Sequence, residues 1–147
     1  MPTVRGCYLP DELLYDVANH TWYVEVGDGT VKLGMTQVAT ALAGELVAFT
    51  PKRVGRSVKE GKSCATIESG KWVGPAKSIT AGEVIAINDE LVDNPKLANA
   101  DPYAAWMVVL KPDDWDAVKG VLTLGSDVTA KYEAKMDEDG FEGCEAA

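Results

Sequence analysis

The sequence is short of positive charge, of histidine and of long apolar runs. It has 14 Lys and Arg against 23 Asp and Glu in 147 residues, which gives a formal net charge of −9. This balance opposes binding to the phosphate backbone of a nucleic acid or to an anionic membrane surface. Residues 1–6 lack the apolar run of a signal peptide, and no segment approaches the length that spans a bilayer. We therefore expect a cytoplasmic protein without nucleic-acid or membrane partners.

Cysteine and histidine are too sparse for a metal site or for a secreted disulfide framework. The three cysteines, Cys7, Cys64 and Cys144, are odd in number and widely spaced, so free thiols are the default expectation. Cys64 lies on a predicted strand, where we expect a small buried apolar residue. Cys7 and Cys144 lie in the terminal arms, and the sequence leaves open whether they pair, contact sulfur transiently or do neither. His20 is the only histidine, so no metal site is predicted.

The composition predicts one domain with two terminal extensions. At 147 residues, with 46% apolar and 25% charged residues, the chain is long enough for one substantial core. Residues 1–19 form a predicted N-terminal arm, in which early carboxylates predict a short helix over 11–17. Residues 20–112 form the predicted β domain and 113–135 a helical segment. Residues 136–147 are acidic and rich in Gly and Ala, which predicts a mobile tail.

Turn signals place a hairpin and a helix at the start of the β domain. Two apolar stretches within 21–33 flank the Gly-Asp-Gly triplet at 27–29, and its Asp-Gly pair is a strong hairpin signal. Thr36 is suited to cap a helix over 37–43, which Gly44 ends.

A short internal repeat follows. The order of small, acidic and apolar residues in 43–49 returns in 81–87, at an offset of about 38 residues. Seven matching positions are too few for a repeat array. A pseudo-twofold β-sandwich or a flattened barrel explains them.

The most informative stretch is a predicted hairpin around a lysine. Apolar-rich segments at 64–67 and 72–76 flank Glu68-Ser69-Gly70-Lys71, and Gly70 tolerates the positive φ of a tight turn. Lys71 is therefore predicted at or beside the hairpin tip. A lysine there gains no core packing, and its amine can be acylated. The plain alternative is a solvated turn lysine, and Lys77 on the outgoing strand is the nearest competitor for a modification.

These residues, followed by Thr80-Ala81-Gly82-Glu83-Val84 and Asn88-Asp89-Glu90-Leu91, resemble the attachment hairpin and returning strand of glycine-cleavage H proteins and related lipoate-binding proteins. The resemblance runs from about residue 20 to about residue 135 and includes Pro102-Tyr103, Trp106-Met107 and Lys111-Pro112.

The resemblance implies a mainly β, lipoyl/biotinyl-type sandwich, a barrel-sandwich hybrid, with peripheral short helices and a C-terminal helix. It implies lipoic acid attached covalently to Lys71, with Glu68, Ser69, Gly70 and Trp72 completing the attachment hairpin. Such a protein is a carrier and not an enzyme, because the chemistry belongs to the cofactor and to the enzymes that it visits. No catalytic residue is therefore predicted.

The sequence departs from the family pattern at two places. The family's usual His-Glu-Trp is His20-Thr21-Trp22 here, so a cationic aminomethyl cargo would lose an ion-pair partner worth about 1–3 kcal/mol. His20 and Thr21 are the predicted contacts in an arm pocket. The usual Glu-Ser-Val-Lys-Ala is Glu-Ser-Gly-Lys-Trp here, followed by Gly-Pro in place of Ser-Asp. Trp72 is either a core residue or an apolar rest for the dithiolane.

An altered arm pocket and added cysteines are similar to features of the lipoate-binding proteins of heterodisulfide-reductase-like sulfur oxidation. On that resemblance we expect a carrier of sulfur-bound intermediates, with Cys7 and Cys144 as candidate redox or sulfur-contacting residues. Its expected partners are a lipoate–protein ligase or other lipoylation enzymes, a heterodisulfide-reductase-like complex and dihydrolipoyl dehydrogenase. One alternative is the H protein of glycine cleavage, which carries an aminomethyl group. Another is an unmodified H-like interaction module.

Overall fold

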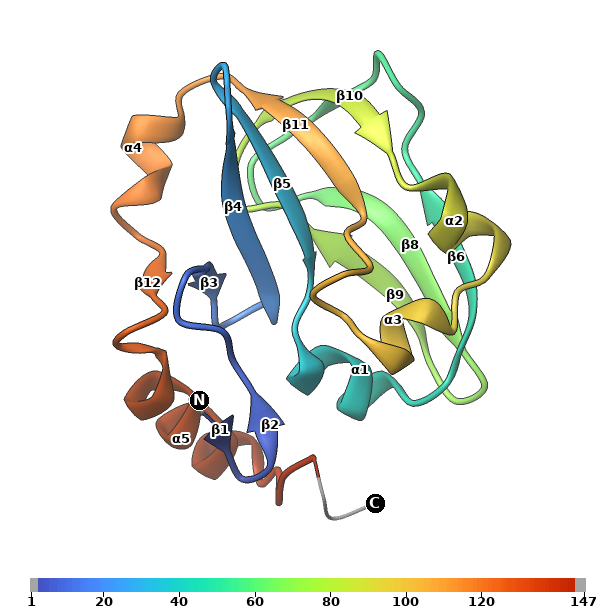
Figure 1. Ribbon diagram of the computed structural model, residues 1–147. Helices are drawn as coiled ribbons and strands as arrows, with labels where there is room; N and C mark the ends of the chain where they lie inside the picture. The colour runs from blue at the N-terminus through green and yellow to red at the C-terminus, as the bar shows by residue number, and fades with distance from the viewer. Residues whose placement is uncertain (1–2, 145–147) are drawn as a thin grey trace.

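The protein is mainly β, as a computed structural model that describes residues 3–144 shows (Figure 1). The strands are β1 (Thr3–Val4), β2 (Cys7–Tyr8), β3 (Leu14–Asp16), β4 (Thr21–Gly27), β5 (Thr30–Met35), β6 (Leu46–Pro51), β7 (Ser57–Val58), β8 (Ser63–Ser69), β9 (Val73–Lys77), β10 (Gly82–Ile87), β11 (Val108–Pro112) and β12 (Thr123–Leu124). The helices are α1 (Gln37–Ala43), α2 (Asp89–Asp93), α3 (Leu97–Ala100), α4 (Trp115–Lys119) and α5 (Val128–Asp139).

The strands form two main antiparallel sheets. A seven-stranded sheet has the order β12-β3-β4-β5-β11-β10-β7, a three-stranded sheet has the order β6-β8-β9, and β1 pairs with β2. The main core contains fully buried side chains from both sheets, among them Leu33, Leu46 and Ile67. The predicted fold class is confirmed, with short helices at the periphery and a C-terminal helix. The described strands do not close into a barrel.

The opening hairpin and helix form as their local signals predict. The strands β4 and β5 pair from Thr21↔Met35 to Gly27↔Thr30. The backbone N–H of Ala39 donates to Thr36 Oγ1 at 3.2 Å, which caps α1, and Gly44 ends the helix with φ 84°. The helix α1 is thereby capped at both ends.

The two copies of the internal repeat form strands of different sheets. The first copy forms β6 of the three-stranded sheet and the second forms β10 of the seven-stranded sheet. Leu46 and Val84 are matching positions of the repeat, and both are fully buried. This arrangement agrees with the pseudo-twofold interpretation of the repeat.

The helix predicted over 11–17 is wrong. This segment forms a turn followed by β3, which pairs with β4 through Tyr15↔Trp22. Tyr15 is 1% exposed, and its hydroxyl donates to the carbonyl of Pro10 at 2.7 Å. Pairing with an available sheet edge and burying an aromatic ring outweigh the weak preference of carboxylates for a helix start.

The C-terminal helix is longer than predicted, and the residues after it are packed. Buried Val128, Tyr132 and Met136 recur every four residues, so the apolar stripe of α5 continues past 135. Gly140 ends the helix with φ 68°. The following chain returns to the N-terminal arm, where Cys144 N donates to Arg5 O at 2.9 Å. The predicted mobile tail is therefore wrong up to residue 144, and 145–147 lie outside the described residues.

Cys7 and Cys144 form a disulfide between the two terminal segments. Their Cα atoms are 5.1 Å apart across a sequence separation of 137, so the default expectation of free thiols is wrong for this pair. Cys64 is free and fully buried, as predicted. Burial raises the pKa of the Cys64 thiol to about 12, which keeps it protonated and unreactive at neutral pH.

Two kinds of feature are absent from the described part of the chain. Between residues 3 and 144, no helix has both the length and the apolar character needed to cross a membrane. The same residues contain no group of three or more His, Cys, Asp or Glu side chains arranged to hold a metal ion.

Candidate functional site: the Lys71 hairpin and its cleft

Lys71 lies at the tip of the hairpin that joins β8 and β9. The two strands pair antiparallel from Ser63↔Lys77 to Glu68↔Val73. Ser69 closes the turn, because its N–H donates to Trp72 O at 2.8 Å and its hydroxyl accepts from Lys71 N at 3.3 Å. The predicted position of Lys71 is confirmed.

The side chain of Lys71 is accessible and its stem is supported. A Cβ placed on Gly44 would lie 3.1 Å from Lys71 Cε and 3.8 Å from Nζ, so the stem passes over the end of α1. Lys71 is exposed, and within residues 3–144 its ammonium group has no ion-pair partner. Glu68 is also exposed on β8. An amine held in this way is free to be acylated.

Gly70 is not required by the turn geometry. Its φ is not positive, unlike that of Gly44, and a Cβ at this position would meet no atom within 4 Å. The predicted reason for a glycine here, a left-handed turn conformation, is therefore wrong.

A matched pair of glycine substitutions tests this difference. Gly44 has φ 84° and ψ −163°, a region nearly restricted to glycine, so Gly44→Ala should lower the free energy of unfolding by about 1–3 kcal/mol. Gly70→Val should change it by less than about 0.5 kcal/mol. Urea unfolding of both variants measures the effect. An equal loss from both would contradict the assigned turn geometry.

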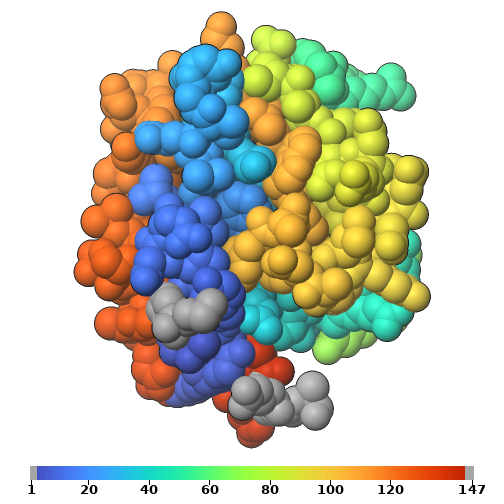
Figure 2. All heavy atoms as spheres, viewed as in Figure 1, coloured from blue at the N-terminus to red at the C-terminus, as the bar shows by residue number. Residues whose placement is uncertain are grey.

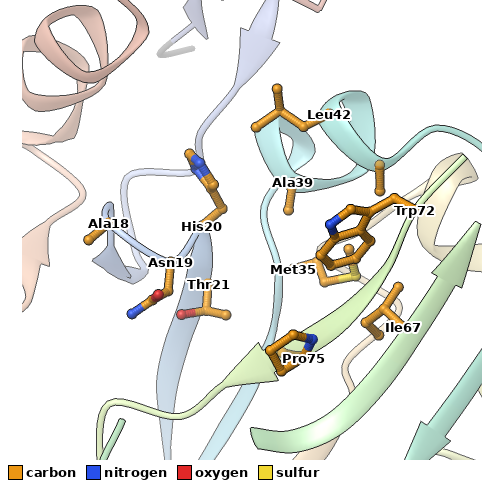
Figure 3. Close-up of a pocket in the computed structure, with 12 residues that line it drawn as sticks. Ala18, Asn19, His20, Thr21, Met35, Ala39, Leu42, Ile67, Trp72 and Pro75 are labelled. Carbon is orange, nitrogen blue, oxygen red and sulfur yellow. The ribbon is translucent and has the colours of Figure 1, made fainter. Parts of the chain in front are cut away.

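A cleft opens beside the hairpin, with a volume of about 340 Å³. Its lining residues are Ala18, Asn19, His20, Thr21, Met35, Ala39, Leu42, Ala43, Ile67, Trp72, Pro75 and Ala76. Figure 3 shows Trp72 on one side of the cleft and His20 and Thr21 on the other. Among residues 3–144, the lining contains no Asp, Glu, Lys or Arg, so this part of the cleft is largely apolar and uncharged.

Trp72 belongs to the cleft and not to the core. Its side chain is 43% exposed and lines the cleft next to Lys71. The indole lies on Gly74, where an added Cβ would be 2.3 Å from Trp72 Cζ2. Any larger residue at 74 would displace the ring. Residues i and i+2 of a strand share a face, and this spacing was the signal that could have linked Trp72 to Gly74, which both differ from the family pattern of the hairpin.

His20 and Thr21 both line the cleft. His20 has φ 57°, and its Nδ1 lies 3.1 Å from the hydroxyl of Tyr132 in α5. Burial, with a smaller contribution from the positive charge of Lys135, lowers the pKa of His20, so its imidazole is neutral at pH 7. The hydroxyl of Thr21 donates to Tyr23 OH at 3.2 Å. The cleft therefore offers hydrogen-bonding groups without a charge.

The structure does not bring every candidate residue to this site. Cys7 and Cys144 are absent from the cleft lining, and Cys144 Sγ lies 3.8 Å from Gln37 O at the start of α1. Conversely, Leu42 lines the cleft and was not predicted. It is 41% exposed on α1, and an apolar residue on the outer face of a short helix was the available signal.

An accessible lysine on a hairpin tip beside an apolar cleft is the arrangement of a swinging-arm carrier domain. Residues 13–136 match the profile of the family described as "Glycine cleavage H-protein". The chain belongs to this family.

Named relatives and a solved structure agree with this assignment. The chain is 47% identical to "Glycine cleavage system H protein 5" of Aquifex aeolicus, covering 83% of this chain and 85% of that protein. It is 36% identical to "Probable glycine cleavage system H protein 2" of Sulfurisphaera tokodaii, covering 89% and 90%. The crystal structure of a glycine cleavage system H protein from Mycobacterium marinum has a TM-score of 0.72 at 29% identity, covering 89% of this chain and 98% of that chain.

Members of this family are carriers and not enzymes, and they bear lipoic acid attached covalently to a lysine. The residues described here fit that group. The hairpin presents an exposed amine, and the neighbouring cleft provides an apolar surface for a dithiolane. The protein is accordingly a lipoyl carrier.

Proposed function

We propose that Lys71 is the lipoyl-bearing lysine of a cytoplasmic carrier. The observation that supports this proposal is the exposed, unpaired amine at the tip of the β8–β9 hairpin. The competitor Lys77 is also exposed, but it is the last residue of β9 and pairs with Ser63 within the sheet. A modifying enzyme has to enclose the lysine and its flanks, and a hairpin tip allows this better than a strand.

The arm would rest in the cleft beside the hairpin. Lipoic acid supplies a dithiolane that is reduced, acylated or loaded through sulfur by partner enzymes. Trp72, Leu42 and Met35 would hold its apolar end and shield it from water. Aromatic rings make favourable contacts with sulfur, so Trp72 is well suited to receive the dithiolane.

Fluorescence tests the role of Trp72. A disulfide in contact with an indole quenches its emission, so reduction should raise tryptophan fluorescence more in the lipoylated protein than in the unlipoylated protein, where Cys7–Cys144 is the disulfide that is reduced. We expect Trp72→Phe to abolish this additional rise and Trp115→Phe, a substitution outside the cleft lining, to preserve it. An additional rise that depends on lipoylation and survives in Trp72→Phe would contradict the proposed resting place, while lipoylation itself would be unaffected.

The family and the names of its relatives support an aminomethyl cargo. On this proposal the protein is an H protein of glycine cleavage. Its partners are then the lipoylation enzymes, the glycine-cleavage enzymes and dihydrolipoyl dehydrogenase.

A second cargo, bound through sulfur, is favoured by one specific observation. Thr21 stands where the family usually has a glutamate, and the described residues that line the cleft include no carboxylate to pair with an aminomethyl cation. Proteins named H protein 2, 3 and 5 also occur together in Aquifex aeolicus, so several members of this family coexist in one organism. The partner would then be a heterodisulfide-reductase-like complex.

Loading with glycine distinguishes the two cargoes. The lipoylated protein would be incubated with glycine decarboxylase and glycine, and the aminomethyl adduct would be measured by mass spectrometry. Efficient loading of the native protein assigns glycine cleavage and overturns the sulfur cargo. If the cargo is sulfur-bound, Thr21→Glu should improve aminomethyl loading about tenfold or more, whereas the uncharged control Thr21→Gln should not. A sulfur-containing adduct on the lipoyl group of Lys71 in native material would support the sulfur-bound cargo.

A further inference from the structure

A cluster of positive charge lies in the segment that connects β6 to β8. Residues 52–62 hold five of the 14 Lys and Arg residues of the chain and one carboxylate, Glu60. The five cations, all of them exposed, are Lys52, Arg53, Arg56, Lys59 and Lys62. This segment, which we call the basic segment, thus carries a formal charge of +4 in a chain whose net charge is −9.

The cations of the basic segment have no acidic partner in residues 3–144. None of the five forms an ion pair or a side-chain hydrogen bond there, although the chain has 23 Asp and Glu residues. Elsewhere cations do find such partners, as in the pairs Lys96–Glu45 at 3.0 Å and Lys119–Glu25 at 2.8 Å. The positive charge of the basic segment is therefore available to an external group.

The backbone of the basic segment is fixed to the rest of the fold. Gly55 N donates to Val84 O at 2.8 Å, and Val84 N donates to Arg56 O at 2.9 Å. Lys52 N donates to Cys64 O at 2.9 Å. Around these contacts lies an open depression of about 580 Å³, lined by Pro51, Lys52, Arg53, Gly55, Arg56 and Ser57. Cations on a fixed frame lose less entropy when they bind than cations on a free loop.

The basic segment lies at the far end of β8 from Lys71. The basic segment precedes Ser63, the first residue of β8, whereas the hairpin tip follows Ser69, its last residue. Because a seven-residue strand spans roughly 20 Å, the segment and the tip are separated by about that distance. Figure 2 shows the segment, in turquoise to green, projecting at the upper right, while Figure 1 shows the β8–β9 turn at the lower right. A partner held at this end leaves the lysine and its cleft uncovered.

We propose that the basic segment is a docking surface for an acidic face of a partner protein. At about 0.1 M salt, electrostatic interactions are screened beyond about 10 Å. A compact acidic face bound next to this segment would therefore interact mainly with the positive charge of the segment. A long polyanion or a membrane would also approach the acidic remainder of the molecule and be repelled. Charge complementarity therefore favours a protein over a nucleic acid or a lipid surface.

Docking at a distance from the lysine suits a protein that has to expose its hairpin. A partner bound through the basic segment raises the local concentration of the carrier without blocking Lys71. Complementary charge also accelerates encounter, and this advantage falls as salt rises. The inference does not depend on which lysine is lipoylated, because it rests on the charges and geometry of residues 52–62 alone.

Binding of defined probes to the full chain tests the proposal. The probes are a labelled oligoglutamate decapeptide, a thymidine decanucleotide and anionic phosphatidylglycerol vesicles, each titrated at 20 and 150 mM NaCl. We expect the peptide to bind most tightly and more weakly at the higher salt. The triple variant Lys52→Gln/Arg53→Gln/Arg56→Gln should weaken peptide binding at least fivefold. The control Lys96→Gln/Lys119→Gln/Lys131→Gln removes the same charge from exposed lysines outside the basic segment and should leave binding within twofold.

Three outcomes would overturn the proposal. Equal weakening of peptide binding by both triple variants would show that only the net charge of the protein matters. The absence of peptide binding at 20 mM NaCl would show that the basic segment is not a docking surface for acidic protein faces. Tighter binding of the nucleotide or of the vesicles would assign the segment to another class of partner. Circular dichroism of both variants verifies folding. The mass of the Lys71 peptide after lipoylation is measured separately, so failure here is distinguishable from failure of the carrier assignment.

Discussion

Lys71→Arg is expected to abolish lipoylation of the protein completely. Arginine keeps the positive charge and the stem that passes over Gly44, so the hairpin should fold as before. Its guanidinium group stays protonated and does not form the amide that attaches lipoic acid. The variant therefore removes the attachment chemistry while leaving shape and charge nearly unchanged.

Mass spectrometry checks this result on protein from its native host or made together with a lipoate–protein ligase. Native protein should show a lipoyl-sized increment on the peptide that contains Lys71, and Lys71→Arg should show none. The control Lys77→Arg changes the nearest competing lysine and should remain fully lipoylated. Native material without a lipoyl increment on Lys71 or Lys77, or normal cellular function of Lys71→Arg and Lys77→Arg, would favour an unmodified interaction module over the carrier proposal.

The features predicted correctly from the sequence are those set by local signals. An Asp-Gly pair defined the β4–β5 hairpin, Thr36 and Gly44 bounded α1, and flanking apolar segments placed Lys71 at a turn. In each case the deciding contact joins residues close in the chain. Short-range patterns carry that information without knowledge of the fold.

The features that the sequence did not predict depend on distant partners. The segment at 11–17 becomes a strand because the edge of β4 is available to it. The chain after α5 is packed because Arg5 and Cys7 lie beside it. Neither partner is identifiable from the neighbouring sequence. Local propensity therefore predicted a helix over 11–17, and composition predicted a mobile tail after residue 135.

The candidate site likewise has residues that short sequence patterns identified and residues that only the tertiary structure revealed. Lys71 and Thr21 were identified from the sequence because each occupies a position of a short family pattern. The seating of Trp72 on Gly74 and the contribution of Leu42 to the cleft emerged only when α1 and β9 were placed together. A cleft is built by several elements, so its walls follow from tertiary packing and not from any one motif.

Loss of the Cys7–Cys144 disulfide should destabilise the protein by about 2–5 kcal/mol. The bond closes a loop spanning 137 residues, nearly the whole chain, so its removal enlarges the conformational freedom of the unfolded state more than removal of a short-range bond would. It also ties the end of α5 to the N-terminal arm. The variants Cys144→Ser and Cys7→Ser should therefore show similar losses in urea unfolding without reductant.

Reductant provides the matched control for the disulfide, because it should destabilise the native protein and leave Cys144→Ser unchanged. The effect should also reach the cleft, since Tyr132 of α5 contacts His20 at 3.1 Å and the capping hydroxyl of Thr36 at 3.4 Å. Hydrogen exchange should accordingly rise in α5 and in the first turn of α1, while the β8–β9 strands stay protected. Exchange that rises only beyond residue 139 would show that the bond holds the C-terminal end alone, without supporting the wall of the cleft.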